Sequence, residues 1–410
     1  MLRALRSRDF RFLWLSQSVS VIGDALVVVA IGLYVTRLTG NPTDVGIVLA
    51  AYALPLVVFV LLGGVVADRL PRQQVMVASD LCRAVLHGTL AVLIATGTVR
   101  IWHMVAIGLL FGTAEAFFRP AYTGLVPQTV DEGDIQAAQA LGGVSTELAS
   151  FASPALATAL VLGVGGQTAF ALDAATFIVS ASLLGRVHGR ARGKAAERST
   201  VARELAEGWS AVRQRGWVLC TILSFSAALM VALAPFLVLG ATVAKHVYGT
   251  EAVFGLTNAA FGVGTVTGAV IGSKWCPRHP MRTGMMAAVW WPPAIAVYAL
   301  GPPLPVLYPV MVAAGAGIGL FAVLWETALA QRIPPHLLSR VSAWDWMGSL
   351  ALLPAGYLIA GPVADALGEV PVLVVGASIG ALAAVLGLLP PSTRSLTRLE
   401  QVPAELTLAG

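Results

Sequence analysis

The hydrophobic positions of this chain form long continuous runs, not the short alternating stretches that are typical of strands. Each run has about 20 apolar residues, the length that an α-helix needs to cross a hydrocarbon core roughly 30 Å thick. Turn residues and charges separate the runs. We therefore predict twelve membrane-spanning helices, at residues 12–38, 44–67, 75–97, 102–123, 137–162, 167–186, 217–244, 251–273, 283–302, 305–327, 341–364 and 370–390.

One long polar segment divides the twelve runs into two sets of six. It is rich in Arg, Lys and Glu, and we expect residues 200–215 within it to be partly helical. The predicted fold is all-α and integral to the membrane. Its parts are a six-helix first half at 1–186, a linker at 187–216, a six-helix second half at 217–390 and a tail at 391–410.

The two halves repeat the same order of features. Residues 35–74 and 243–280 each contain a basic residue, a short loop, a glycine-rich span and a basic turn. Pro154 in the first half has a counterpart in Pro354 of the second half. Two six-span halves repeated in parallel and joined by a linker are typical of the major-facilitator architecture.

Composition agrees with a membrane protein. The chain is 57% hydrophobic and 11% charged, whereas a soluble domain carries roughly a quarter charged residues. The net charge of +5 does not indicate a nucleic-acid partner, because the basic residues lie in short loops and form no stripe with interleaved aromatic residues.

The basic residues instead predict the orientation of the chain. On the boundaries above, 21 of the Lys and Arg residues lie on the side of the termini, three lie on the other side (Arg37, Arg100 and Lys245), and two lie within spans (Arg83 and Arg119). By the positive-inside rule, both termini and the linker are expected in the cytoplasm. The predicted location is the bacterial inner membrane.

Motifs for other chemistry are missing from the sequence. Cys82, Cys220 and Cys276 show no ligand spacing, so we expect neither a disulfide framework nor a metal site. No nucleophile elbow, H-E-x-x-H motif or phosphate-binding loop occurs, and no cofactor or enzymatic activity is expected.

Four passages resemble the major facilitator superfamily, and specifically its drug:proton antiporter branch, which includes macrolide efflux proteins and enterobactin exporters. They are RDFRFLWLSQSVSVIGDALVVVAIGLYVTRLTG, GGVVADRLPR, AFFRPAYTGLVPQTVDEGDIQAAQAL and AFALDAATFIVSASLL. The resemblance covers the whole chain in layout, but its specific motifs lie mostly in the first half. It implies a monomeric transporter that works by alternating access.

The second passage matches the superfamily loop pattern G-x-x-x-D-R-x-x-R through Gly64, Asp68, Arg69 and Arg72. By resemblance, this loop latches the two halves together in the outward-facing state. The alternative is that its charges only mark topology. In the fifth span, Pro154 stands among small residues where exporters often carry an antiport motif, and its role is either gating or helix packing.

Acids within spans are candidates for coupling, because burying a charge in a membrane is unfavourable. Asp24 shares one helical face with Gln17 and Ser20 in the first span. By resemblance, this span lines the central cavity, so Asp24 is expected to carry the proton and its two neighbours to contact substrate. The alternative is that Asp24 only forms hydrogen bonds with a neighbouring helix.

The fourth span is another cavity-lining helix by resemblance. It carries the stripe Phe111, Glu115, Phe118 and Tyr122, with Arg119 one turn from the acid. An acid among aromatic rings suits a lipophilic cation. Glu115 and Arg119 could instead only neutralise each other. Glu147 in the fifth span is a third acid, which could exchange partners with Arg119.

In the second half, Phe321 and Trp325 are the expected substrate contacts, although Trp325 could be an interfacial anchor. The remaining intramembrane polar residues are interpreted as structural. Four are placed within about two turns of cytoplasmic helix ends, where they can reach headgroups or one another (Asp80, Arg83, Glu326 and Asp345). In peripheral spans, His87 is interpreted as a packing residue and Asp173 as a hydrogen-bonded packing residue. Coupling chemistry is thus expected mainly in the first half.

The function predicted from these features is export of small lipophilic or amphipathic compounds, such as drugs, antibiotics, siderophores or other natural products, in exchange for protons. Uptake or lipid flipping by the same fold is the alternative. A membrane-embedded enzyme would need clustered His or Asp near one interface, and a receptor that transports nothing would need no acids within its spans.

Overall fold

The computed structural model describes residues 3–131, 134–188, 201–275 and 277–397. Over these residues the chain forms helices and no strands. The first half contains α1 (Arg8–Thr39), α2 (Pro42–Arg69), α3 (Arg72–Ala95), α4 (Ile101–Thr129), α5 (Ile135–Ala159) and α6 (Gly166–Leu184). The linker helix is α7 (Val201–Arg213). The second half begins with α8 (Gly216–Ala228), α9 (Ala234–Tyr248), α10 (Ala252–Lys274), α11 (Pro280–Ala288) and α12 (Trp291–Ala299). It continues with α13 (Leu304–Arg332), α14 (Pro335–Leu350), α15 (Leu353–Leu367) and α16 (Glu369–Leu386). The short α17 (Pro391–Arg394) follows.

Ten helical segments in the described part are long and apolar enough to span a membrane. They include the continuous segments Gly216–Tyr248, through α8 and α9, and Arg340–Leu367, through α14 and α15. The other two crossings are α5, extended by a π-helical turn at Leu160–Val164, and the pair α11 and α12. This pair is interrupted ahead of Pro292, because proline lacks the amide that would continue the hydrogen-bond ladder. The structure confirms the predicted fold class of twelve transmembrane helices in two halves.

The halves are built on equivalent helix contacts. In the first half α2 packs along α4, and in the second half α10 packs along α13. Small residues allow both approaches. A Cβ added at Gly63 of α2 would lie 2.1 Å from the carbonyl oxygen of Ala116, and one at Gly268 of α10 would lie 1.9 Å from that of Ala316.

The outer faces of the helices are apolar. Val85 of α3, Ile178 of α6 and Leu382 of α16 are 68%, 55% and 57% exposed, respectively. Many other large apolar side chains are exposed over both halves, and apolar surface of such extent indicates a face that lipid or protein covers. Their distribution over both halves fits a chain surrounded by lipid.

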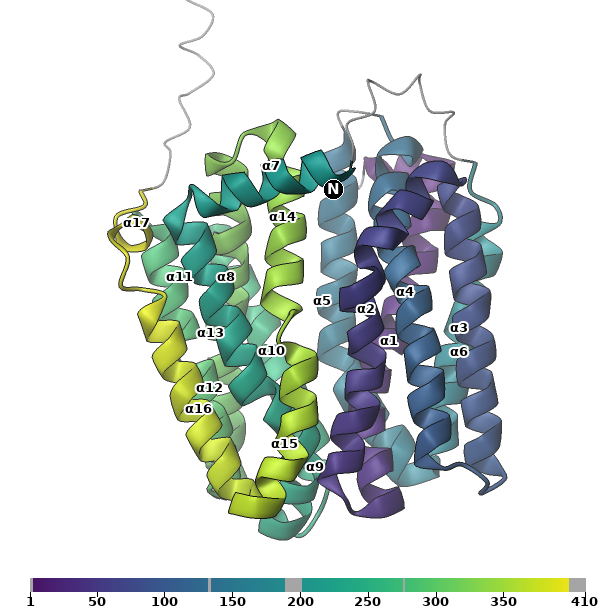
Figure 1. Ribbon diagram of the computed structural model, residues 1–410, viewed down its shortest axis with the longest axis vertical. Helices are drawn as coiled ribbons and strands as arrows, with labels where there is room; N and C mark the ends of the chain where they lie inside the picture. Colours follow the sequence, from purple (N-terminus) through teal and green to yellow (C-terminus); the bar gives the residue numbers. More distant parts are fainter. Residues whose placement is uncertain (1–2, 132–133, 189–200, 276, 398–410) are drawn as a thin grey trace, which may run out of the picture.

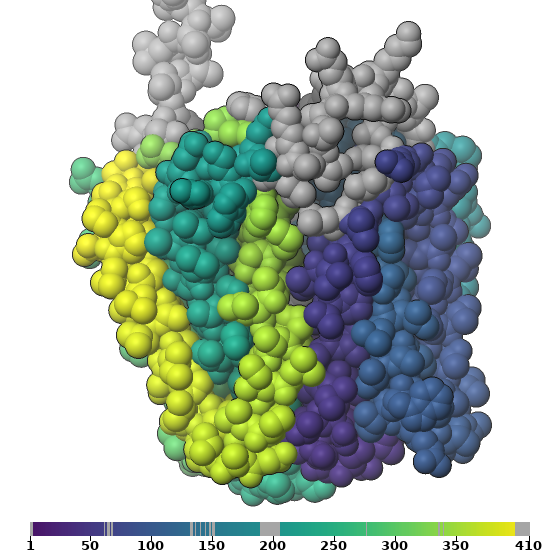
Figure 2. All heavy atoms as spheres, viewed as in Figure 1, coloured from purple at the N-terminus to yellow at the C-terminus, as the bar shows by residue number. Residues whose placement is uncertain are grey.

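Contacts between the halves concentrate at the end of the molecule opposite α7. There α2 packs against α15, and α5 against α10, while α7 crosses the other end (Figure 1). In the space-filling view the two halves meet along α2 and α15 (Figure 2). We call the end that carries α7 the linker end, and the other the hairpin end.

Polar contacts also join the halves at the hairpin end. Arg37 Nε of α1 donates to Glu251 Oε2, just before α10, at 2.7 Å. Thr43 Oγ1 of α2 donates to Asp365 Oδ2 of α15 at 3.3 Å. A Cβ at Gly46 would lie 2.2 Å from the carbonyl oxygen of Tyr357, so the backbones of α2 and α15 are close here.

Candidate functional site

The polar face of α1 is present as the sequence predicted, but its oxygens are poorly satisfied. Ser20 is buried, while Gln17 and Asp24 are half-buried. Gln17 Oε1, Ser20 Oγ and Asp24 Oδ1 are shielded from solvent and have no hydrogen-bond partner among the described residues. Unsatisfied buried oxygens are unfavourable and uncommon in native proteins. This face can therefore accept a proton, or a hydrogen bond from a donor group of a substrate.

Arg83 of α3 is the main charge next to this face. Its side chain is 1% exposed, its Nη2 donates to Asp80 Oδ1, and its Nη1 lies 3.6 Å from Asp24 Oδ1. The second oxygen of Asp80 accepts a 2.6 Å hydrogen bond from Ser180 of α6. Two carboxyl groups thus share one buried guanidinium, and only Asp80 is hydrogen-bonded to it.

Aromatic rings enclose the same guanidinium. Its carbon lies 4.3 Å from the ring centre of Phe177 and 4.4 Å from that of Phe118, with Phe111 at 5.7 Å. The rings exclude water, and their faces attract the cation. Electrostatic changes at Asp24 therefore act on Arg83 with little screening by solvent.

This arrangement corrects two predictions. Asp80 and Arg83 reach one another, which was one of the two outcomes expected for them, but they are fully buried and do not reach headgroups, because Arg83 lies near the middle of α3 and points into the first half. Phe111 and Phe118 are each 4% exposed and pack around Arg83, so the stripe on α4 is not one substrate-facing surface. Helical spacing places residues on one face, but neighbouring helices decide how much of that face is covered.

A second buried polar cluster adjoins the first. His87, one turn beyond Arg83, hydrogen-bonds through Nδ1 to Asp173 of α6 and through Nε2 to Tyr52 Oη of α2, the latter at 3.0 Å. His87 and Asp173 are both 0% exposed. A Cβ at Gly23 would lie 2.0 Å from Asp173 Oδ1, so the position preceding Asp24 needs glycine to admit this carboxyl group. The interpretation of His87 and Asp173 as packing residues missed their pairing.

The rest of α4 carries a partly exposed ion pair, in which the side chain of Arg119 is 46% exposed and that of Glu115 is 18% exposed. Arg119 donates to Glu115 Oε1 from Nε at 2.8 Å and from Nη2 at 2.6 Å, so the expected neutralising pair is formed. The arginine carbon also lies 5.4 Å from the ring centre of Trp346 on α14, across the interface between the halves. Tyr122 is half-buried, and its hydroxyl lies next to Gly142 of α5. The side chain of Glu147 lies outside the described part of the structure.

The second half contains a cavity of about 160 Å³ with a different lining. Its walls are Thr221, Phe225, Phe321, Ala322, Trp325, Glu326, Asp345 and Ser349. Phe321 stacks on Phe225 with ring centres 4.5 Å apart. Trp325 Nε1 donates to Asp345 Oδ2 at 2.9 Å. The cavity thus combines three aromatic rings with two carboxyl groups and no basic side chain.

This cavity corrects the predictions for the second half. Trp325 is 5% exposed and hydrogen-bonded to Asp345, so it is not an interfacial anchor. Glu326 lies within two turns of the end of α13, as predicted, whereas Asp345 lies further along α14, and both line the cavity next to Phe321. Phe321 and Trp325, the two aromatic residues singled out in the sequence, are thereby brought together with two acids.

Two of the predicted gating residues, Gly64 and Asp68, lie in α2, where the structure describes only their helical backbone. Arg69 is exposed at the end of α2, and Arg72 donates to the carbonyl oxygen of Gly124 on α4. Pro154 is buried in α5, and its carbonyl accepts a 2.8 Å hydrogen bond from Thr158. Thr158 in turn packs on Gly255 of α10, so this part of α5 supports the contact between the halves.

One signal in the sequence could have identified the buried clusters. Asp80, Arg83 and His87 are spaced by three and four residues, which places three titratable side chains on one face of α3. Such a face needs polar partners inside a protein.

No group of three or more His, Cys, Asp or Glu side chains that could hold a metal ion occurs among the described residues.

Comparisons with known proteins agree with the fold. A family model described as "Transmembrane secretion effector" matches residues 1–405. Multidrug efflux pump Tap of Mycolicibacterium fortuitum is 25% identical over 84% of this chain and 87% of its own length. Macrolide efflux protein A of Streptococcus pyogenes is 22% identical over 88% and 90%, respectively. The MFS-type transporter YfiS of Bacillus subtilis is 26% identical, but the match spans only 40% of its length. Among solved structures, the nucleoside transporter NupG superposes with a TM-score of 0.70 at 13% identity, over 93% of this chain and 98% of that one, which shows the fold alone.

Proposed function

Because the chain belongs to the transmembrane secretion effector family of the major facilitator superfamily, we propose that it is a secondary active exporter of small lipophilic or amphipathic compounds, driven by proton antiport. The direction of transport is supported by Tap and macrolide efflux protein A, whose names describe efflux. The proposed location is the bacterial inner membrane with cytoplasmic termini, which the 21 to 3 distribution of basic residues supports.

The observation that carries the coupling proposal is the sharing of Arg83 between Asp24 and Asp80. Asp24 Oδ1 lies 3.6 Å from the arginine and has no hydrogen bond among the described residues. Protonation of Asp24 would remove one of the two negative charges and leave Arg83 to pair with Asp80 alone. Because α1 also carries Arg37 of the contact at the hairpin end, a shift of α1 on protonation could be transmitted to that contact.

Substrate is proposed to bind between the halves, with its cationic or aromatic part in the cavity of the second half. A volume of about 160 Å³ is below the roughly 300–1,000 Å³ of a pocket that encloses a drug-sized ligand. The remainder of the substrate would extend toward Gln17, Ser20 and Tyr122. Carboxyl groups beside aromatic rings attract an organic cation through charge and through the ring faces.

The exporter proposal is tested in energised cells with and without the protein. Cells that contain it should accumulate less of a fluorescent lipophilic dye, and a protonophore should abolish the difference. Greater accumulation in those cells would instead support uptake, the alternative for this fold. A difference that persists with the protonophore would exclude proton antiport.

The role of the second-half cavity can be tested by substituting Asp345, which lines it. Asp345→Asn should weaken binding of cationic substrates by about tenfold or more, because the cavity loses one of the two carboxyl groups that attract a cation. Neutral substrates should bind nearly as well as before. Binding to purified protein can be followed by tryptophan fluorescence. Ser349→Ala is the matched control, since it removes only a 3.4 Å hydrogen bond to the same carboxyl group. Equal losses for neutral and cationic compounds would indicate a packing role for Asp345.

A further inference from the structure

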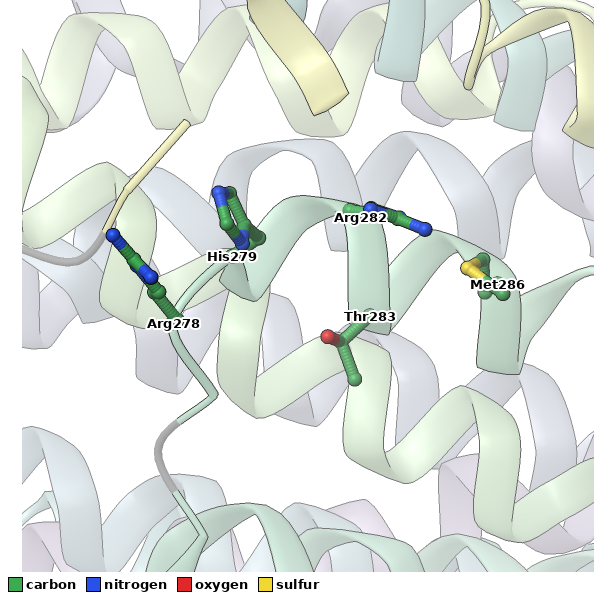
Figure 3. A pocket seen from close by; sticks show the side chains of 5 residues that line it. All are labelled: Arg278, His279, Arg282, Thr283 and Met286. Carbon is green, nitrogen blue, oxygen red and sulfur yellow. The ribbon is translucent and has the colours of Figure 1, made fainter. Parts of the chain in front are cut away.

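A cavity of about 330 Å³ lies apart from the proposed translocation site. Arg278, His279, Arg282, Thr283 and Met286 line it where the chain enters α11 at the linker end (Figure 3). Its volume falls within the roughly 300–1,000 Å³ of ligand pockets. Three of its five lining residues are basic and none is acidic, so its charge favours an anion.

The basic side chains of this cavity have no partners among the described residues. No hydrogen bond or ion pair joins the side chain of Arg278, His279 or Arg282 to another described side chain or backbone group. Other arginines at this end are bound, including Arg215, which donates to the carbonyl oxygen of Ala211 at 2.9 Å, and Arg394, which donates to that of Leu389 at 2.8 Å. The cavity therefore groups charges that no side chain in the described part of the chain neutralises.

The start of α11 adds to the attraction for an anion. The helix begins at Pro280, and its N-cap residue, His279, forms no side-chain cap. First-turn amides without a cap favour a negative group. They lie in the same loop-to-helix turn as the two arginines (Figure 3).

The lining changes from charged to apolar along α11. Arg282, Met286 and Trp290 follow one another at intervals of four residues, which places them in line along the helix and the break after it. Met286 is 52% exposed and Trp290 is 67% exposed. A free inorganic anion would contact only the charged part of this stripe, whereas an amphipathic ligand would contact all of it.

We propose that this cavity binds the phosphate headgroup of an anionic phospholipid, with the acyl chains lying along Met286 and Trp290. Basic pockets at the cytoplasmic ends of membrane helices have the chemistry to recognise such headgroups. The site is connected to the transport machinery through the next turn of α11. Gly284 packs on Phe321, whose ring would lie 3.3 Å from an added Cβ, and Phe321 lines the cavity of the second half. A bound lipid would thus hold α11 against the wall of that cavity.

The test uses the purified full-length protein, freed of lipid in a neutral detergent and titrated in native mass spectrometry. Phosphatidylglycerol should remain bound at concentrations where phosphatidylcholine does not. The double variant Arg278→Gln, Arg282→Gln should lower the affinity for phosphatidylglycerol by about tenfold or more. Its matched control is Arg11→Gln, Arg213→Gln, which removes two exposed charges at the same end but outside the cavity. This control should bind phosphatidylglycerol like the unmodified protein.

Three results would overturn the proposal. Equal binding of phosphatidylglycerol and phosphatidylcholine would show that the charge of the headgroup does not contribute to binding. Equal losses in the two double variants would show that net charge, and not this cavity, attracts the lipid. Displacement of phosphatidylglycerol by inorganic phosphate would identify a site for free anions. Thermal unfolding of both variants without lipid should match that of the unmodified protein, since all four arginines are substituted at exposed positions.

Discussion

Asp24→Asn is expected to abolish active export while leaving substrate binding intact. The substitution keeps the size of the side chain but removes the group that would bind and release the proton beside Arg83. The expected loss of proton-driven export is about 100-fold, the scale that follows loss of a positioned proton-transfer group. Substrate-induced proton release from purified protein measures the effect, with binding followed in parallel by tryptophan fluorescence.

Two further substitutions are compared with Asp24→Asn. Asp44→Asn changes a carboxyl group in the first turn of α2, at the hairpin end and outside the cluster, and should leave proton release unchanged. Asp173→Asn changes the partner of His87 and tests whether the second cluster shares the proton. If Asp24→Asn releases protons as the unmodified protein does, the carrier is another acid. Glu115 and Glu147 would then be the next residues to test.

Arg83→Gln is expected to have the largest effect on stability. Asp80 would keep its hydrogen bond from Ser180 but lose its counter-charge in a buried environment, and Asp24 would lose the same cation. Breaking a buried ion pair from one side costs about 3–5 kcal/mol. The melting temperature of the purified protein in detergent should fall accordingly, and expression should fall with it.

A second substitution separates charge from packing. Adding Asp80→Asn to Arg83→Gln removes the uncompensated carboxylate and should recover much of the lost stability. Arg119→Gln is the matched arginine control on the adjacent helix, where a half-exposed pair with Glu115 contributes only about 0.2–1 kcal/mol. If the double variant is no more stable than Arg83→Gln, the contacts of Arg83 with Phe118 and Phe177 dominate, and not its charge.

The twelve spans could be predicted from the sequence alone, because the length and apolarity of a membrane helix are local properties that its own residues carry. Residues 12–38, for example, lie within α1, and 217–244 lie within the segment from α8 to α9. The π-helical turn at Leu229–Leu233 did not obscure this run, since it interrupts the helix type and not the apolarity. The polar face of α1 could also be predicted, because Gln17, Ser20 and Asp24 follow one another at spacings of three and four residues, about one helical turn each.

The pairing of the charged residues could not be predicted from the sequence, because it depends on how the helices pack. Arg83 contacts Asp24 from a position 59 residues away in the chain, and His87 pairs with Asp173 across 86 residues. The helical period shows which residues of one helix share a face, but not how that helix is rotated against its neighbours. That rotation depends on close approaches such as Gly23 against Asp173, where the absence of a single Cβ allows a carboxyl group of α6 to lie beside the backbone of α1. For the same reason, Phe111 and Phe118 were expected to line a cavity, whereas packing places them around a buried arginine.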